Sequence, residues 1–269
     1  MPRSEAVLKL PTGLQREDGV ELLRRLVEKS KRHEQVPFAK AFLRSAAEGG
    51  PPLARLIQGG RGGEVRLKMF LTITMAATRR PYDMRTPPTP GYWAKMLAVA
   101  GAQPARRAAD ALRWLDKEGF VKLTPRKGAP PQITLLTPQA QGEPGIEYKR
   151  PVDAKEWYIS LPLELWKNGW IIDLPATSLA LLMVIRDVQR AKNQLSYVPS
   201  GERDLYGLSP DTWTRGRNDL ERRGLLEVKR VPQGGEFDYR RMRNLYRVCM
   251  ERFGDPPPAE RELPQPFSQ

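Results

Sequence analysis

The side chains best suited to chemistry on a ligand lie in the stretch SPDTWTRGRNDLERRG, at residues 209–224. Ser209 is a favoured N-cap and Pro210 a favoured first helical residue, so the pattern predicts a helix that begins there. Arg215 and Asn218 then fall on the face opposite the apolar residues. In a DNA major groove, arginine pairs with guanine and asparagine with adenine, each through two hydrogen bonds. The stretch therefore predicts a helix that reads base edges in duplex DNA.

The same frame occurs earlier in the chain, shifted by 105 positions. Leu115 aligns with Leu220, and Gly119 aligns with Gly224, where each predicted helix ends in a left-handed cap. An apolar strand start follows each glycine, and a shorter helix precedes each longer one. The repeat predicts two winged helix-turn-helix domains in tandem, each with its second helix in a DNA major groove. The fold class is accordingly expected to be mainly α with small β-hairpins (α+β), with additional N-terminal helices.

A polar hairpin, the wing, is predicted after each of these helices. Residues 120–123 and 132–136 form the first hairpin, whose tip TPRKGAPP carries two basic side chains. The second wing spans residues 232–236, and its return strand alternates arginine with apolar residues. Hydroxyl groups at a helix N-terminus suit phosphate, and arginines suit phosphate or guanine. The candidate DNA-binding residues are Arg106, Arg107, Arg113, Arg126, Lys127, Thr212, Thr214, Arg215, Asn218, Arg222, Arg241 and Arg243.

These candidates need a scaffold, and shifts in composition predict its boundaries. Apolar periodicity predicts N-terminal helices at residues 17–31, 37–47 and 52–58. A glycine-rich stretch at 59–63 lacks the Gly-Lys-Ser/Thr ending of a phosphate-binding loop, so we expect it to be a flexible joint. The expected divisions are an N-terminal helical region at 1–60, a first winged-helix domain at 61–137, a linker at 138–154, a second winged-helix domain at 155–250 and a disordered proline-rich tail at 251–269.

The charge balance indicates a polyanionic partner. The 269 residues include 45 Lys and Arg against 31 Asp and Glu, a net charge of +14 at pH 7. Such a balance favours nucleic acid first and an anionic membrane surface second. Because no stretch has the apolar length of a membrane span or the core of a signal peptide, no membrane association is expected. We expect a cytoplasmic, nucleoid-associated protein, either monomer or homodimer.

Enzyme chemistry finds few suitable residues in this chain. His33 is the only histidine and Cys249 the only cysteine. A zinc site of the usual nitrogen and sulfur ligands needs more of both, and a Ser-His-Asp or Cys-His set needs a histidine near its nucleophile. A magnesium site made of carboxylates alone stays open. The expectation is a protein that is not an enzyme, with no cofactor and no metal site.

Four stretches also resemble a known group of proteins. They are PPLARLIQGGRGGEVRLK, ALRWLDKEGFVKL, ISLPLELWKNGW and YGLSPDTWTRGRNDLERRGLLEV, and they span most of residues 51–247. Together they resemble actinobacterial tandem winged-helix proteins of unassigned function. The resemblance implies the fold and DNA binding, and it brings no known activity. Two winged helices in one chain is, more loosely, similar to the layout of iteron-binding plasmid replication initiators.

These observations lead to three functional hypotheses. The first is a sequence-specific protein that binds double-stranded DNA and regulates transcription through both winged helices. The second is a replication or partition initiator of a plasmid or mobile element, which binds origin repeats and recruits a protein partner through the N-terminal helices. The third is an adaptor whose winged helices bind protein. Steep salt dependence of nucleic-acid binding separates the first two from the third, because phosphate contacts release counterions.

Overall fold

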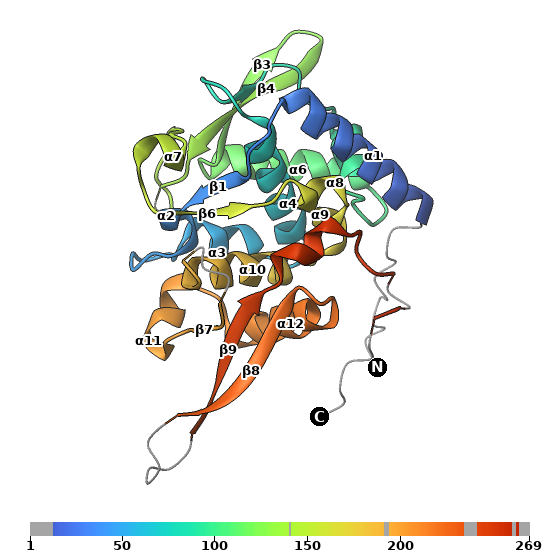
Figure 1. Ribbon diagram of the computed structural model, residues 1–269. Helices are drawn as coiled ribbons and strands as arrows, with labels where there is room; N and C mark the ends of the chain where they lie inside the picture. The colour runs from blue at the N-terminus through green and yellow to red at the C-terminus, as the bar shows by residue number, and fades with distance from the viewer. Residues whose placement is uncertain (1–12, 140, 191–193, 234–240, 260–261, 264–269) are drawn as a thin grey trace, which may run out of the picture.

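The computed structural model describes residues 13–139, 141–190, 194–233, 241–259 and 262–263 of the chain (Figure 1). It is a mixed α and β structure in which helices lie between two hairpins at opposite ends of the molecule, and all strand pairings are antiparallel (Figure 1). Two groups of elements repeat the same order along the chain. Each group contains helices and a three-stranded antiparallel path, and it ends in a hairpin.

The first group begins with a helix that is buried almost throughout. Its elements are α4 (Arg61–Ala76), β2 (Asp83–Met84), α5 (Pro90–Met96), α6 (Pro104–Lys117), β3 (Val121–Arg126) and β4 (Ala129–Thr137). The short strand β2 pairs with β4, which also pairs with β3. The strand order is therefore short strand, last strand, middle strand. Thr89 caps α5 by accepting a hydrogen bond from the amide of Tyr92.

The second group has the same order of elements. They are α10 (Ala176–Val188), β7 (Ser196–Tyr197), α11 (Ser200–Arg203), the 3₁₀ turn η1 (Asp204–Tyr206), α12 (Pro210–Arg222), β8 (Leu226–Gln233) and β9 (Arg241–Val248). Here too the short strand β7 pairs with the last strand β9, which pairs with β8. The Ser209 hydroxyl accepts a hydrogen bond from the amide of Thr212, which confirms the predicted N-cap of α12.

The junction from helix to strand is built identically in both groups. Gly119 and Gly224 have φ of +71° and +70°, the left-handed region that glycine adopts at little cost. After each glycine, the next amide donates to a helical carbonyl 2.9 Å away, from Phe120 to Leu115 and from Leu225 to Leu220. This is the hydrogen bonding of a Schellman cap. The glycine caps predicted 105 positions apart are therefore confirmed.

The N-terminal segments pack on both groups and share their core. Helix α1 (Gly13–Ser30) lies against α4, α5 and the short helices α8 (Glu164–Lys167) and α9 (Trp170–Asp173). Helix α3 (Pro52–Ile57) lies against both α4 and α10. The side chains of Trp166 and Trp170 are fully buried in the continuous apolar core that results. Consequently the two groups are joined through their first helices.

A buried carboxylate ties the N-terminal segments to the second group. Asp187, on α10, is 2% exposed. It accepts hydrogen bonds from the Trp157 indole at 3.0 Å and from the Tyr206 hydroxyl at 2.8 Å. The Arg44 guanidinium lies 3.2 Å from the same carboxylate. Because a buried charge is stable only when it is paired and hydrogen-bonded, these contacts fix the junction.

Two stretches in the N-terminal part of the chain differ from the sequence predictions. The helix predicted at 37–47 is wrong in its first part, where β1 (Val36–Ala39) pairs with β6 (Tyr158–Leu161) and only α2 (Lys40–Leu43) is helical. The glycine-rich joint is partly helical, because α4 begins at Arg61. A Cβ at Gly63 would lie 2.5 Å from the Ile57 carbonyl oxygen, so this glycine allows two helices to approach.

The expected linker and tail both contain ordered elements. Within 138–154, β5 (Ile146–Glu147) pairs with β4, and α7 (Pro151–Ala154) packs against β1. Near the start of the expected tail, the 3₁₀ turn η2 (Met250–Gly254) buries Phe253 against Trp170. These segments gain stability from contacts with distant elements, which their proline and glycine content does not reveal.

Helix α12 approaches α10 most closely at a glycine. A Cβ at Gly216 would lie 2.7 Å from the Thr177 carbonyl oxygen. Gly216→Ala should therefore lower the free energy of unfolding by about 1–3 kcal/mol, because overpacking outweighs the helix preference of alanine. Urea denaturation measures the change, with Gly201→Ala as control, since a Cβ at Gly201 meets nothing within 4 Å. Equal stability of the two variants would contradict the close packing.

Candidate nucleic-acid interface

The exposed face of α12 carries the strongest base-reading candidates. Arg215 and Asn218 are both exposed there, as the helical spacing predicted. The Nε of Arg215 donates to Asp211 at 2.9 Å, and the Asn218 side-chain oxygen accepts from Arg217 at 2.9 Å. An exposed ion pair spaced by four residues contributes only about 0.3–0.5 kcal/mol. Both side chains can therefore exchange these partners for a ligand at little cost.

The hydroxyl groups of the threonines at the start of α12 already form hydrogen bonds within the helix and its cap. The Thr212 hydroxyl accepts from the Ser209 hydroxyl at 2.9 Å, and its amide donates to the same hydroxyl at 3.1 Å. Thr214 donates from its hydroxyl to the Pro210 carbonyl at 2.9 Å. Each hydroxyl oxygen keeps its capacity for further hydrogen bonds. Thr212 lies in the first turn, where a helix favours an anion, and Thr214 lies just after it.

Buried contacts hold α12 in this orientation. Trp213 and Leu220 pack into the core, on the face opposite Arg215 and Asn218. The Asp219 carboxylate accepts from the Ser178 hydroxyl on α10 at 2.7 Å and from Arg223 at 2.9 Å. The exposed face of α12 is thus set by a hydrogen bond and a close helix contact on its other side.

Helix α6 presents its candidates in a similar way. Arg106 and Arg113 are exposed, and Arg113 pairs with Asp110 on the same face. Arg106 donates to the Gln103 side chain at 3.3 Å. Arg107 is half-buried and donates to the Ala100 carbonyl, so it stabilises the turn between α5 and α6. Of these three arginines, Arg106 and Arg113 are therefore the better placed to reach a ligand.

Acidic residues balance the arginines on both helices. Asp110 follows Arg106 on α6, and Asp211 and Glu221 flank Arg215 on α12. Burial raises the pKa of Glu221 above its ordinary value, and the opposing effect of Arg217 is smaller. Consequently the helices alone carry little excess positive charge, and attraction to phosphate depends on the segments beside them.

The first hairpin and its surroundings supply that charge. Arg126 and Lys127 are exposed at its tip, and Arg126 donates to the Arg85 carbonyl in the loop before α5. The end of α1 approaches the same loop, since Lys29 donates to Thr86 at 3.4 Å. Sequence reasoning did not propose the further exposed basic side chains here. We name the whole set the basic end: Lys29, Lys31, Arg79, Arg80, Arg85, Lys122, Arg126 and Lys127.

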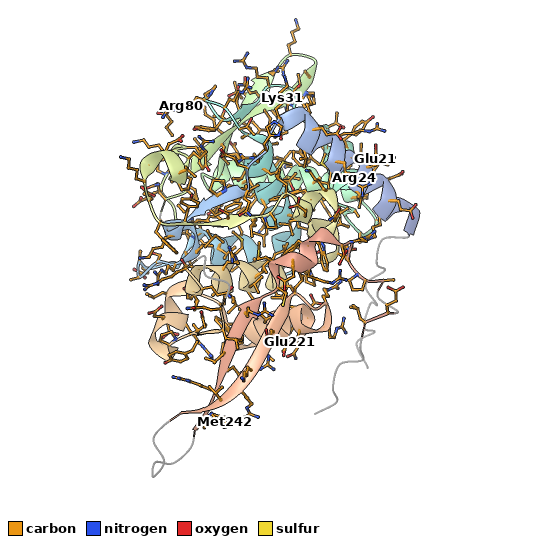
Figure 2. The ribbon with its side chains drawn as sticks, in the orientation of Figure 1. Glu21, Arg24, Lys31, Arg80, Glu221 and Met242 are labelled. Atoms are coloured by element: carbon orange, nitrogen blue, oxygen red, sulfur yellow. The ribbon has the colours of Figure 1, made fainter. Side chains whose placement is uncertain are left out.

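The basic end lies far from the second hairpin. Figure 2 shows Lys31 and Arg80 at the end of the molecule that carries β3 and β4, and Met242 at the opposite end, on β9. Asp83 is the acid paired with Arg85, at 3.6 Å, and its side chain is 10% exposed. In the sequence, the basic runs RRPYDMR and KSKRH indicate that basic residues cluster in these two segments. They lie outside both predicted helix-turn-helix frames and therefore drew no candidate.

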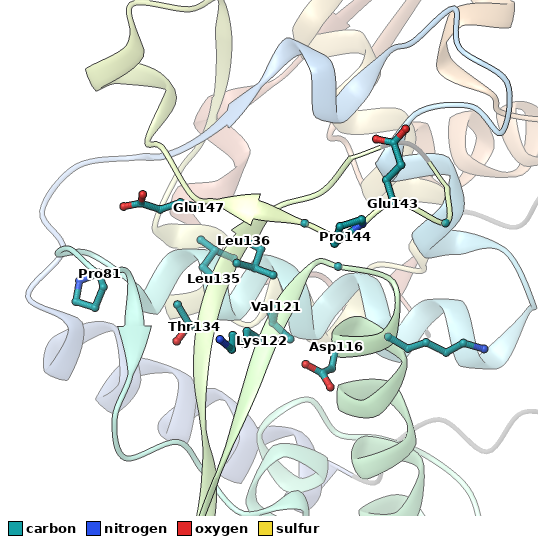
Figure 3. A pocket seen from close by; sticks show the side chains of 14 residues that line it. Pro81, Asp116, Val121, Lys122, Thr134, Leu135, Leu136, Glu143, Pro144 and Glu147 are labelled. Carbon is teal, nitrogen blue, oxygen red and sulfur yellow. The ribbon is translucent and has the colours of Figure 1, made fainter.

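A hollow of about 720 Å³ adjoins the base of the first hairpin (Figure 3). Asp116, Glu143 and Glu147 contribute carboxylates to its lining, opposite Lys117 and Lys122. The Asp116 carboxylate accepts a hydrogen bond from the Leu123 amide at 2.8 Å. This mixture of charges gives no net attraction for a polyanion, so the basic surface ends here.

The second hairpin holds its arginines more tightly. The Arg243 guanidinium lies 4.9 Å from the centre of the Tyr197 ring, and Arg247 pairs with Glu227 at 2.6 Å. Arg222 is half-buried, 3.9 Å from Asp219. The side chain of Arg241 and the hairpin tip at 234–240 lie outside the described residues. The arginines described on β9 are therefore engaged in contacts, whereas Lys229 and Arg230 on β8 are exposed.

The described residues form neither a metal site nor a membrane-spanning helix, and the chain has no match among known proteins. Among these residues, no three His, Cys, Asp or Glu side chains gather closely enough to hold a metal ion. None of the helices formed by the described residues is long and apolar enough to cross a membrane. Comparison with protein-family models, with curated proteins and with solved structures finds no match to this chain.

Proposed function

We propose that this protein binds double-stranded DNA sequence-specifically, through two winged helix-turn-helix units in one chain, and regulates transcription. Each unit consists of a first helix, a short strand, two further helices and a hairpin. The single observation that carries the proposal is the repetition of this order, with the same strand order in both sheets. In such units the second helix of the pair enters the major groove. That role falls to α6 and α12.

The distribution of charge supports DNA as the ligand. The exposed arginines of α6 and α12 suit base edges or phosphate, and the basic end suits the backbone or the minor groove. Because the helices carry balancing acids, affinity comes mainly from the basic end and specificity mainly from α12. This division of labour is typical of DNA recognition, in which phosphate contacts position the protein and base contacts specify the sequence.

The two units also suggest the form of the DNA site. A single winged helix commonly needs a partner subunit to read two half-sites about one helical turn apart, roughly 34 Å. Here the two units share one core, so a single chain presents two different readers. The expected site is a pair of unequal half-sites read by one molecule, and a plasmid or mobile-element initiator binding origin repeats would use the same arrangement.

One observation favours a second candidate function for the second unit. Its helix α12 and its hairpin hold most of their described arginines in ion pairs or ring contacts, while Tyr197 and Met242 are exposed beside them. A surface of paired charges and exposed aromatic or thioether groups suits a protein partner. In that alternative only the first unit binds DNA.

The double substitution Arg215→Ala with Asn218→Ala separates these alternatives. If α12 reads bases, affinity for the selected site should fall by on the order of 10- to 100-fold while binding to random duplex stays within about twofold. Fluorescence anisotropy on both duplexes measures this. Arg25→Ala is the control, because Arg25 forms a similar exposed ion pair on α1, with Glu21. An equal loss on both duplexes would indicate phosphate contact only, and no loss would indicate a protein-binding α12.

A further inference from the structure

A second, smaller cavity lies at the C-terminal end of α6. Its volume is about 250 Å³, and it is lined by residues from α3, the start of α4, α6 and the segment after β4. The polar side chains in the lining are Arg55, Gln58, Arg66, Glu118 and Gln141. The cavity is separate from the exposed face of α6 and from the basic end, so the DNA proposal does not account for it.

Arg55 forms the buried wall of this cavity. It is 3% exposed, and its Nη2 donates to the Gln139 carbonyl at 2.6 Å. Its Nε and Nη1 are buried without a hydrogen bond to the described residues. The nearest acid is Glu118, whose carboxylate oxygen lies 3.9 Å from Nη1, beyond hydrogen-bond distance. A buried cation therefore keeps donors unused next to an open cavity, which is costly unless a ligand offsets it.

A second guanidinium faces the same space. Arg66 is half-buried and stacks on Trp114, with its central carbon 4.3 Å from the ring centre. Its Nη1 is 3.4 Å from the Gln58 carbonyl. Burial lowers the pKa of both Arg55 and Arg66, and Glu118 opposes this effect in each case. Two partly desolvated guanidinium groups thus share one carboxylate.

We propose that this cavity binds a phosphate group. Two guanidinium groups and the side-chain amides of Gln58 and Gln141 provide donors around it, and arginine is the preferred residue for phosphate. Glu118 neutralises only one of the two guanidinium charges. A phosphate monoester carries about −1.5 to −2 charges at pH 7, so a bound phosphate offsets the remaining positive charge. The Glu118 side chain is 22% exposed, so it has room to turn toward solvent when a phosphate binds Arg55.

Two sources of phosphate fit this chemistry, a small free ligand and the backbone of nucleic acid. Both would act on the same helix, since Trp114 lies on α6 and Glu118 is its C-cap residue. A free ligand would make the cavity an effector site that bears on the DNA-reading helix. A backbone phosphate would extend the DNA contact past the end of α6. The experiment below distinguishes them.

Isothermal titration of inorganic phosphate into the full chain, at ionic strength held constant with sodium chloride, tests the site without any DNA. We expect saturable binding in the wild type, a Kd at least about tenfold higher in Arg66→Gln, and a Kd within about twofold in Arg25→Gln. Gln141→Glu, at an exposed position, should also weaken binding, because it adds a second carboxylate to the cavity. Heats that do not saturate, or equal Kd values in wild type and Arg66→Gln, would overturn the proposal.

A second arm identifies the source of the phosphate. The same titration is repeated with the protein saturated by duplex DNA. Loss of phosphate binding, together with weaker DNA binding by Arg66→Gln, assigns the site to the DNA backbone. Unchanged phosphate binding assigns it to a free ligand. Because the first arm contains no DNA, failure of the DNA-binding proposal leaves its result intact.

Discussion

Replacement of Arg126 and Lys127 by glutamine should lower affinity for duplex DNA by on the order of 10- to 100-fold at about 0.1 M salt. Both side chains are exposed at the tip of the first hairpin, within the basic end. Each phosphate contact contributes about 0.9 to the slope of log K against log salt, so two lost contacts should flatten that slope by about 1.8. Anisotropy titrations across a salt series measure both quantities.

The matched control for this variant removes two positive charges elsewhere. Lys40→Gln with Lys155→Gln changes two exposed lysines outside the basic end, at the start of α2 and directly after α7. This control should keep the wild-type slope and lose less than about threefold in affinity, through net charge alone. If both double variants lose affinity equally, the basic end has no special role and the charge of the chain acts only as a diffuse field.

Arg32→Leu should lower the free energy of unfolding by about 3 kcal/mol or more. The Arg32 side chain is 91% buried at the C-terminus of α4. It donates to the carbonyls of Met75 at 2.7 Å and Thr74 at 3.1 Å. Leucine fills similar space but leaves these carbonyls buried without donors. Desolvation by burial lowers the pKa of Arg32. The carbonyls at the C-terminus of α4 nevertheless stabilise its charged form.

Urea denaturation measures this loss, and Arg25→Leu serves as control. Arg25 is an exposed residue of α1, paired only with Glu21, so its replacement should change stability by less than about 0.5 kcal/mol. A result for Arg32→Leu as small as the control would mean that the hydrogen bonds from Arg32 to the end of α4 contribute little to stability.

The local signals of the two repeated groups were readable from the sequence. The N-cap at Ser209 and the glycines at 119 and 224 act within a few residues, so their effect does not depend on distant partners. The helical spacing of Ala108, Leu112 and Leu115 likewise puts all three on one face of α6, and that face is buried. Local rules therefore predicted the helices and hairpins that carry the candidate residues.

Long-range pairing was not readable in this way. Strand β1 forms because residues 36–39 meet residues 158–161, and no local pattern announces a partner more than a hundred positions away. Apart from Arg126 and Lys127, the residues of the basic end escaped prediction for the same reason, since it joins α1, a loop and a hairpin from separate parts of the chain. The cavity at Arg55 likewise depends on four segments that meet only in the folded chain.

The most direct test of the central claim is selection of bound fragments from random duplex DNA, followed by titration of the selected sequences across a salt series. The proposal predicts an enriched motif with two unequal half-sites about one turn apart, and a log K that falls steeply as salt increases. Absence of enrichment, together with weak binding that does not respond to salt, would contradict DNA binding and direct attention to a protein partner.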